Sequence, residues 1–355
     1  LHGSADLPQT AEVSLPLKET PGTLLGPGAD FVLPKASTDP GKAPEGKPLS
    51  YALFRNLRET TTSGLFNITW RFTGNIPACL RSTILGQPNC RLILTDTPKV
   101  RPAKENEGQV LDYWRPSLVV QRQATDKLSS TFVAIHEPFI SEPFINSVKP
   151  LLATVPTQVG SPVALAIEHI AGTDYVISCS KLDQVALELR RGLRLTFRGL
   201  LAVVRERDGE VLFVYLYDGE KLVLDGFSLN CPPSPTGEIL FVNRDEKQGR
   251  YSFLAMGQIP PGDLLRGSTV IVTHPDKTTH GYLIRAVEPQ GEHSLIHLQD
   301  EPGFEIADGK TRFLFYPQHE LAGTNNYRID NVVVLTRRGD QGYSLWSNCK
   351  AETKT

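Results

Sequence analysis

The chain has 355 residues, which exceeds one ordinary hydrophobic core, so we expect two or three domains. Its 37 basic and 39 acidic residues nearly cancel, and this balance argues against a nucleic-acid-binding protein. No apolar run approaches the roughly 20 residues that cross a bilayer, so the sequence predicts no membrane span. The chain opens with neither Met nor a signal segment, which favours a processed or truncated protein.

The first third predicts strands separated by loops. Residues 1–6 read as the end of a strand whose beginning is missing. Residues 33–48, rich in Pro, Gly, Lys and Asp, predict an exposed insertion. In residues 64–72 apolar side chains alternate with polar ones, as in a half-buried antiparallel strand. The apolar stripe of that strand consists of Phe66, Ile68, Trp70 and Phe72.

Three more short strands are expected before residue 140. They lie at 91–95, 118–122 and 131–135. The third is expected to be buried and to end at a polar His136-Glu137-Pro138 corner, because Pro138 fixes the chain there. A second interpretation of that corner is a histidine held in one tautomer by Glu137 and acting as a base.

The middle of the chain predicts a meander. Short strands at 194–197, 200–205, 211–217 and 221–224 are evenly spaced. Asp208-Gly209 and Asp218-Gly219 lie between strands and predict two hairpin turns, because both residue types tolerate the positive φ that such turns need. Residues 183–191 fit a strand as well as a helix.

The last third continues this pattern after a stiff segment. Residues 231–237 are rich in Pro and suit a connector, so we place a domain boundary near residue 230. Beyond it, strands are expected at 237–242, 251–256, 268–273, 282–287, 294–298 and 312–316. The predicted fold is all-β: an antiparallel β-sandwich over residues 1–230, supersandwich-like and incomplete on one side, a smaller β-module over 231–345 and a frayed tail over 346–355.

Five cysteines are present, and none forms a CxxC pair, which argues against a zinc site made of thiolates. Cys79 and Cys90 flank a short segment with Gly, Pro and Asn. They form a disulfide in an exported protein, or they remain two buried thiols.

Segments spread over the chain share a pattern with one known family. Leu1-His2-Gly3-Ser4 and residues 130–138, 197–209 and 302–304 resemble the C-terminal β-region of heparinase II/III-like polysaccharide lyases. The resemblance implies an α/α-toroid upstream of Leu1 and cleavage of uronate-containing polysaccharide by β-elimination. In that family the catalytic residues and the zinc ligands precede the "LHGS" segment. The resemblance therefore implies no catalytic residue, metal ligand or cofactor in this chain, with zinc only upstream.

The same resemblance implies partners and a location. It implies an acidic polysaccharide and the upstream toroid half as partners, and it allows a homodimer. It also implies a periplasmic or secreted protein.

Five residues are candidate contacts to an acidic sugar. His2 lies at a strand end, where its alternative role is to cap the strand. Trp114, with Arg115 beside it, is expected in a loop as a platform for a sugar ring, a role that Trp346 also fits. Arg190 and Arg194 belong to the densest basic cluster, which is either a carboxylate- or sulfate-binding patch or solvated surface.

The histidines of the last third do not predict a metal site. His293 and His297 share one face of a strand, about 13 Å apart by strand rise. His274, His280 and His319 do not repair that geometry.

Two functions fit these features. The leading one is a structural and substrate-supporting β-region of a heparinase II/III-like lyase. The alternative is a non-catalytic carbohydrate-binding or adhesion module, because a β fold with exposed Trp and Arg side chains serves binding equally well.

Overall fold

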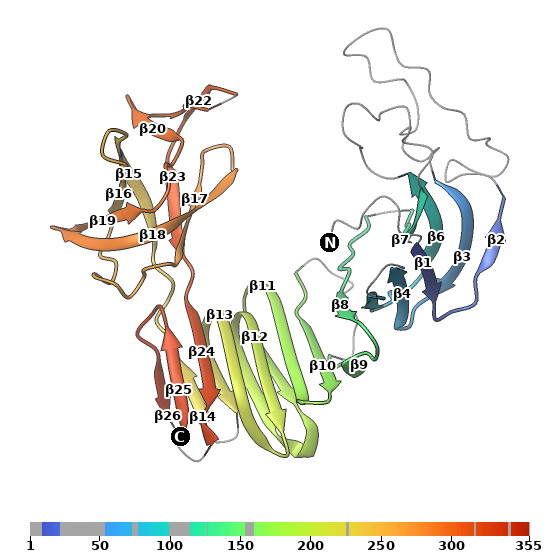
Figure 1. The fold of residues 1–355 in the computed structure, drawn as a ribbon. Coiled ribbons are helices and arrows are strands. Elements are labelled where there is room, and N and C mark those ends of the chain that lie inside the picture. Colours follow the sequence, from blue (N-terminus) through green and yellow to red (C-terminus); the bar gives the residue numbers. More distant parts are fainter. Residues whose placement is uncertain are drawn as a thin grey trace, which may run out of the picture. The chain divides into compact units, whose positions relative to one another are not determined.

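The computed structural model confirms an all-β fold built of antiparallel sheets (Figure 1). It describes residues 9–21, 54–72, 77–98, 114–125, 127–152, 160–224, 227–315, 317–339 and 342–354. The expected strand end at 1–6, the candidate His2 and the expected insertion at 33–48 lie outside these residues. Within the described ranges, no helix has the length and apolarity that crossing a membrane requires.

The chain divides into two compact units. The first comprises Leu1–Ser161 with Glu168–Ile170, and the second comprises Pro162–Ile167 with Ala171–Thr355. The boundary expected near residue 230 falls inside the second unit. The reason is that the chain returns to the same sheet later: β24 (Val332–Arg337) pairs with β13 (Glu210–Leu224).

The first unit contains two four-stranded sheets around one apolar core. One sheet has the order β1 (Gln9–Val13), β4 (Phe66–Phe72), β5 (Cys79–Ile84), β8 (Ala134–Phe139). The other has the order β2 (Lys18–Thr20), β3 (Arg55–Thr62), β6 (Cys90–Pro98), β7 (Trp114–Gln121). Leu92 and Leu94 of β6 join Phe66 and Ile68 of β4 in the core, as in a β-sandwich. β9 (Ile145–Pro150) follows β8 along the chain.

The strand predicted at 64–72 is confirmed as β4. Phe66 and Ile68 are fully buried, whereas Trp70 and Phe72 on the same face are only half-buried. Trp70 packs against the core from its edge. The apolar stripe is therefore covered at one end and partly open at the other.

The prediction that the strand ends at a polar corner at His136 is wrong. β8 begins at Ala134 and continues through Glu137 and Pro138. β8 is the last strand of its sheet, and a strand edge tolerates the missing N–H of Pro. His136 Nδ1 lies 2.7 Å from Ser82 Oγ, while buried Glu137 forms an ion pair with Arg81 at 2.6 Å. These two neighbours have separate partners. The expected burial of this segment also fails at Phe132, which is exposed.

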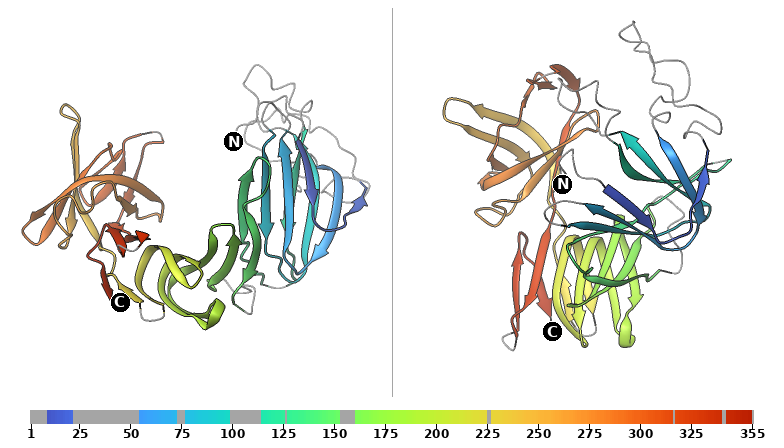
Figure 2. Two further views of the ribbon diagram at one scale, coloured as in Figure 1. Left: turned by 60° about the horizontal axis from the view of Figure 1, so that its bottom comes forward. Right: turned by 45° about the vertical axis from the view of Figure 1, so that its right-hand side comes forward.

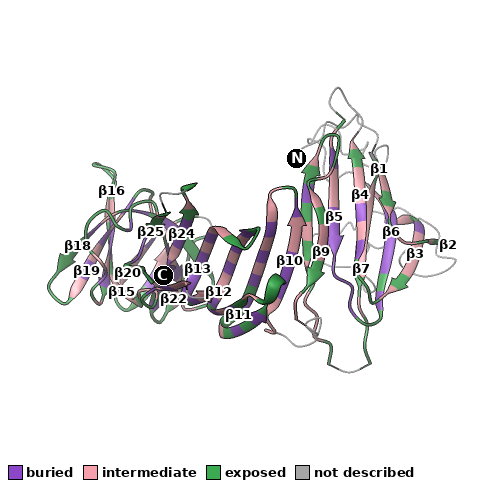
Figure 3. Ribbon diagram, turned by 90° about the horizontal axis from the view of Figure 1, so that it is seen from below, coloured by how far each residue is buried: buried purple, intermediate pink, exposed green. Residues whose placement is uncertain are grey.

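The second unit contains a long antiparallel sheet along whose strands buried residues alternate with half-buried or exposed ones (Figure 3). Residues 183–188 belong to a strand, which resolves the ambiguity at 183–191, and a short 3₁₀ turn follows at Arg190–Gly192. In order along the sheet lie β25 (Tyr343–Ser347), β24, β13, β12 (Arg194–Arg207), β11 (Gly172–Glu188) and β10 (Val163–His169). Glu168 and His169 at the end of β10 are assigned to the first unit.

The two Asp-Gly pairs adopt different structures. Asp208-Gly209 forms the predicted hairpin turn between β12 and β13, with φ of 55° and 89°. The second predicted turn is wrong: Asp218, with φ 46°, lies inside β13, where the register with β12 shifts next to Gly199 and Gly219. A β-bulge uses the same positive φ without reversing the chain. β12 and β13 are therefore two long strands in place of four short ones.

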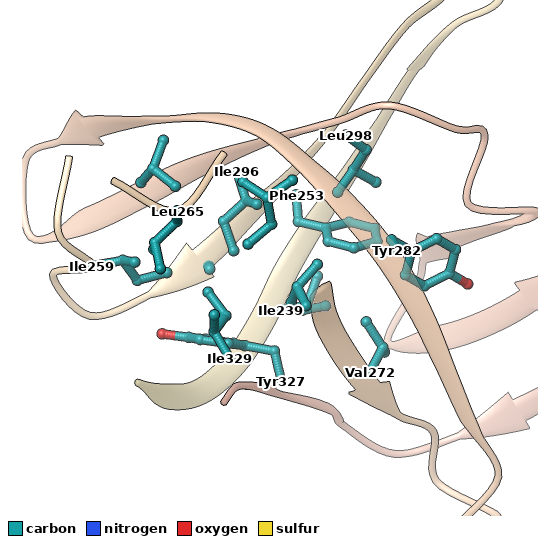
Figure 4. Packing of buried hydrophobic residues seen from close by; sticks show 14 of the residues in the cluster. Ile239, Phe253, Ile259, Leu265, Val272, Tyr282, Ile296, Leu298, Tyr327 and Ile329 are labelled. Carbon is teal, nitrogen blue, oxygen red and sulfur yellow. The ribbon is translucent and has the colours of Figure 1, made fainter. Parts of the chain in front are cut away.

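The chain after residue 235 builds a barrel, in which six described strands close on themselves. Their order is β15 (Thr236–Asp245), β16 (Arg250–Met256), β19 (His293–Leu298), β18 (Thr279–Gln290), β17 (Thr269–Thr273), β23 (Asn325–Ile329). Phe253, Tyr282 and Ile296 point into the barrel (Figure 4). A small sheet follows β19 along the chain: β20 (Phe304–Ala307), β21 (Lys310–Phe313), β22 (His319–Ala322).

The prediction of a frayed tail over residues 346–355 is wrong. β25 extends to Ser347, and β26 (Glu352–Lys354) pairs with β14 (Phe227–Asn230). Backbone pairing of this kind does not need apolar side chains, so the polar composition of the tail did not reveal it. Figure 2 shows the ribbon from two further directions, with the C-terminal strands in red.

Candidate functional site

A cavity of about 420 Å³ lies where the long sheet of the second unit meets the barrel; we call it the junction pocket. Its side chains come from β13, the segment before β17, the residues linking β23 to β24, and β25 with the residues that follow it. They are Tyr217, Arg266, Ser268, Thr269, Ile271, Asp330, Val332, Trp346 and Asn348, with Gly267. The cavity therefore exists only when four separate segments assemble.

Asn348 holds one side of the junction pocket together. Its Oδ1 accepts a hydrogen bond from the backbone N–H of Val332 at 2.7 Å. Its Nδ2 donates to Ser268 Oγ at 3.0 Å and to the carbonyl of Asp330 at 2.9 Å. This side chain is buried, and its amide joins β24 to the chain just before β17 of the barrel. The pocket is thus held by directional bonds as well as by packing.

Asp330 organises a second group of polar contacts. The Tyr217 hydroxyl donates to Asp330 Oδ2, and Arg328 Nε lies 2.6 Å from Asp330 Oδ1. Burial, followed by the hydrogen bond to Asp330, raises the pKa of Tyr217 to about 12. Tyr217 therefore remains a protonated donor at physiological pH, and Arg328 balances the charge of the carboxylate.

The mouth of the junction pocket carries an aromatic face and a cation. The Trp346 side chain is 57% exposed on β25. Arg266 is also exposed, and its Nη2 lies 2.7 Å from Asp263 Oδ1, itself an exposed group. An exposed ion pair of this kind contributes little to the stability of the fold. The Arg266 guanidinium can therefore exchange Asp263 for another anion. Trp and Arg at one mouth suit a ligand with an apolar face and a negative charge.

A second cavity, of about 450 Å³, is lined by histidine and aromatic side chains; we call it the imidazole pocket. Its lining includes His280, Tyr282, Phe313, Phe315 and His319, with Asp276 and Glu301 as acidic members. The rings of Phe313 and His319 stack at 4.3 Å with an interplanar angle of 9°.

His274 lies fully buried behind the imidazole pocket. Its Nδ1 lies 2.7 Å from Asn325 Oδ1, and its Nε2 lies 2.9 Å from His280 Nδ1. Because the Asn325 amide donates to Thr311 Oγ1 at 2.7 Å, its oxygen is left to accept from His274. Burial lowers the pKa of His274, which favours the neutral ring.

The geometry around these histidines does not form a metal centre. In the part of the chain that the structure describes, no three His, Cys, Asp or Glu residues could hold a metal ion together. The rings of His274 and His280 bond to each other, while His297 Nε2 lies 3.2 Å from Glu288 Oε1.

The candidate sugar contacts that the structure describes are divided between the two units. Trp114 lies at the start of β7, so the expected loop is wrong, and the Arg55 guanidinium lies 3.3 Å from the centre of its ring. Arg115 follows it in the first unit and is exposed. Arg190 lies in the 3₁₀ turn and Arg194 begins β12, both in the second unit.

Of the aromatic residues named from sequence, Trp346 is the one that reaches the junction pocket. Sequence reasoning missed Tyr217, Arg266 and Asn348. No spacing pattern could have revealed them, because Tyr217 and its partner Asp330 are 113 positions apart. The one local signal that the sequence analysis used was Trp346 itself, as a ring on which a sugar could stack.

The chain matches no protein-family model, and no curated protein is significantly similar to it.

Proposed function

We propose that this chain is a non-catalytic β-region that binds an acidic polysaccharide at the junction pocket. The observation that carries the proposal is the exposed Trp346 face beside the Arg266 guanidinium, above a polar lining. In the leading form of the proposal, the region supports substrate for a heparinase II/III-like lyase whose catalytic half lies upstream, in an exported protein.

Each chemical feature of a uronate chain has a counterpart here. The C–H face of a sugar ring stacks on an indole, and a carboxylate or sulfate takes two parallel bonds from a guanidinium. Ser268 Oγ accepts a hydrogen bond from the Asn348 amide. The hydroxyl hydrogen of Ser268 is therefore left to donate to a sugar oxygen. Few polar groups placed around an apolar surface are typical of a small-molecule site.

The imidazole pocket supports an acidic sugar less well. Asp276 and Glu301 line it; Arg244 pairs with Glu301, but the exposed Asp276 carboxylate repels a uronate. The first-unit pair Trp114 and Arg55 is also less suitable, because the guanidinium already covers one face of the ring. These contrasts favour the junction pocket as the binding site.

The test is a binding titration of the full chain with heparin, alginate and an uncharged glucan by isothermal calorimetry. We expect Trp346→Ala and Arg266→Ala each to weaken binding to the acidic polymers about tenfold or more. This is the typical contribution of one aromatic or charge-assisted contact to the binding free energy. Phe241→Ala and Arg285→Ala are matched controls, because both residues are exposed on the barrel outside the pocket. Unchanged affinity in the two pocket variants would overturn the assignment.

A second measurement tests the non-catalytic role that both forms of the proposal share. A supporting region should release no unsaturated uronate from heparin or alginate, which is followed by ultraviolet absorbance. Robust product formation by this chain alone would refute the non-catalytic role. The alternative, a binding or adhesion module with no catalytic partner, predicts the same binding results. The two differ in whether a catalytic half is encoded upstream.

A further inference from the structure

Two of the five cysteines lie close together at the end of the long sheet. Cys231 directly follows β14, and Cys349 lies between β25 and β26. β14 and β26 are paired, with Asn230 opposite Glu352. The strand just before Cys231 is therefore aligned with the strand that follows Cys349. Both thiols are free and buried.

The backbone around each cysteine is fixed. The Cys231 N–H donates to the carbonyl of Glu220 at 2.8 Å. The Cys349 carbonyl accepts from Ser347 Oγ at 2.6 Å and from the Ala351 N–H at 3.0 Å. The pairing of β14 with β26 brings these two buried side chains near each other, and each thiol shifts the pKa of the other.

The other three cysteines have different surroundings. Cys79 and Cys90 are both free thiols, and they belong to β5 and β6, in opposite sheets of the first unit. Arg71 Nη1 lies 3.5 Å from the sulfur of Cys79. Cys179 is buried in β11. For these three residues no thiol–thiol contact is present in the described part of the chain.

We propose that Cys231 and Cys349 form a disulfide under oxidising conditions, which fastens the C-terminal strand to the segment that leads into the barrel. The bridge would join chain segments already paired through β14 and β26. Because the strands that flank Cys231 and Cys349 are already paired, whereas Cys79 and Cys90 lie in opposite sheets, this bridge needs less backbone movement than a pairing of Cys79 with Cys90.

The two thiols have unequal reactivity. The hydrogen bond from Cys231 lowers the pKa of Cys349, whereas the hydrogen bond to Cys349 and burial raise the pKa of Cys231. Cys349 is therefore the attacking thiolate. With oxidised glutathione, Cys349 Sγ attacks one sulfur, forms a mixed disulfide and releases one glutathione thiolate.

Cys231 completes the exchange. Its thiol loses a proton, attacks Cys349 Sγ and displaces the second glutathione. The two cysteine protons end on the two released glutathione thiolates, so two protein thiols are oxidised and one glutathione disulfide is reduced. The protein loses two hydrogen atoms and keeps no glutathione.

The test incubates the full chain with oxidised glutathione, followed by alkylation, digestion and mass spectrometry without reductant. We expect one cross-linked peptide pair that contains Cys231 and Cys349, with Cys79, Cys90 and Cys179 recovered as alkylated thiols. Recovery of both Cys231 and Cys349 as thiols, or as two separate mixed disulfides, would overturn the proposal.

Two variants assign the roles. Cys231→Ser should accumulate the glutathione adduct at Cys349, whereas Cys349→Ser should react slowly at Cys231 because the activated thiolate is missing. Oxidation should raise the melting temperature of the wild type, because a bridge restricts the unfolded chain, and neither variant should gain stability. Cys179→Ser is the control: it should cross-link and gain stability as the wild type does. The disulfide does not depend on sugar binding. The result of this test therefore neither supports nor refutes the proposed binding site.

Discussion

The barrel interior and the junction pocket belong to one unit, yet different forces hold them together. Phe253, Tyr282 and Phe304 fill the barrel with aromatic contacts, with ring centres 5.4–6.3 Å apart. The junction instead depends on buried Asn348 and on Asp330 and their hydrogen bonds. Apolar burial is non-directional and scales with area, whereas buried polar groups need matched partners.

This difference teaches where each region is vulnerable. In the barrel, stability should depend on side-chain volume, because closed strands leave no space into which neighbours can relax. At the junction, stability should depend on whether each donor and acceptor keeps a partner. Substitutions in the two regions can test this contrast.

The largest effect is expected for Phe253→Ala. The side chain is fully buried in the barrel, and its removal leaves a cavity beside Tyr282 and Phe304. We expect a loss of about 3–5 kcal/mol in the free energy of unfolding, measured by urea denaturation with a barrel-specific probe. Phe241→Ala, on the outer surface of β15, should change stability by less than about 0.5 kcal/mol. Equal losses in both would contradict a volume-controlled core.

A smaller loss is expected for Asn348→Ala. This change leaves the Val332 N–H without its acceptor and removes two further hydrogen bonds. The expected cost is about 1–3 kcal/mol in the free energy of unfolding, typical of an unsatisfied buried group. Asn326→Ala is the matched control, since Asn326 is exposed on β23. A cost within the error of that control would mean that the junction is not held by Asn348.

Tyr217→Phe should cost less again. It removes the hydroxyl that donates to Asp330 and keeps the ring, while Arg328 continues to pair with the carboxylate. We expect about 1 kcal/mol from chemical denaturation. In a double-mutant cycle with Asp330→Asn, the coupling should account for most of that loss. Strictly additive effects would show that the two groups act independently.

Buried His274, which directly follows β17, provides a polar test, and its expected effect appears only on changing pH. Burial lowers its pKa below the ordinary value of 6.5, with His280, His319 and Asp276 as charged or titratable neighbours. Below pH 6.5 the unfolded chain then binds a proton more readily than the folded chain does. Stability should therefore fall as pH decreases from 6.5 towards the lowered pKa of the folded state.

The measurement is urea denaturation of the wild type and His274→Gln between pH 5 and 8. The variant should lose less stability on acidification than the wild type, although it is less stable at pH 8. An identical pH dependence in both proteins would exclude His274 as the group responsible.

Local patterns predicted much of the barrel and some of the sandwich. The alternation in residues 66–72 gave β4, and the expected strands at 237–242, 251–256 and 294–298 are confirmed within β15, β16 and β19. These strands bury one face, so the two-residue period of their side chains is visible in sequence. The turn at Asp208-Gly209 was predictable for the same reason, since its φ requirement is local.

The errors arose where a distant partner decided the structure. Asp218 has the positive φ that its residue type favours, but pairing with β12 makes it a bulge within one long strand. Trp114 joins β7 because β6 pairs alongside it, with Pro98 opposite Trp114. The polar tail forms β26 because β14 offers a free edge.

The sequence by itself determined the all-β class and the main apolar stripes, and it named Trp346 as a tryptophan that could stack on a sugar ring. Only the tertiary structure brought Ser268 to Asn348, 80 positions away, and Cys231 to Cys349. The physical reason is range: alternation and φ preferences act between neighbouring residues and leave a periodic trace in the sequence. The hydrogen bonds across the junction and the pairing of the two cysteines depend on segments that are far apart in the chain. These segments meet only after the sheet and barrel have formed.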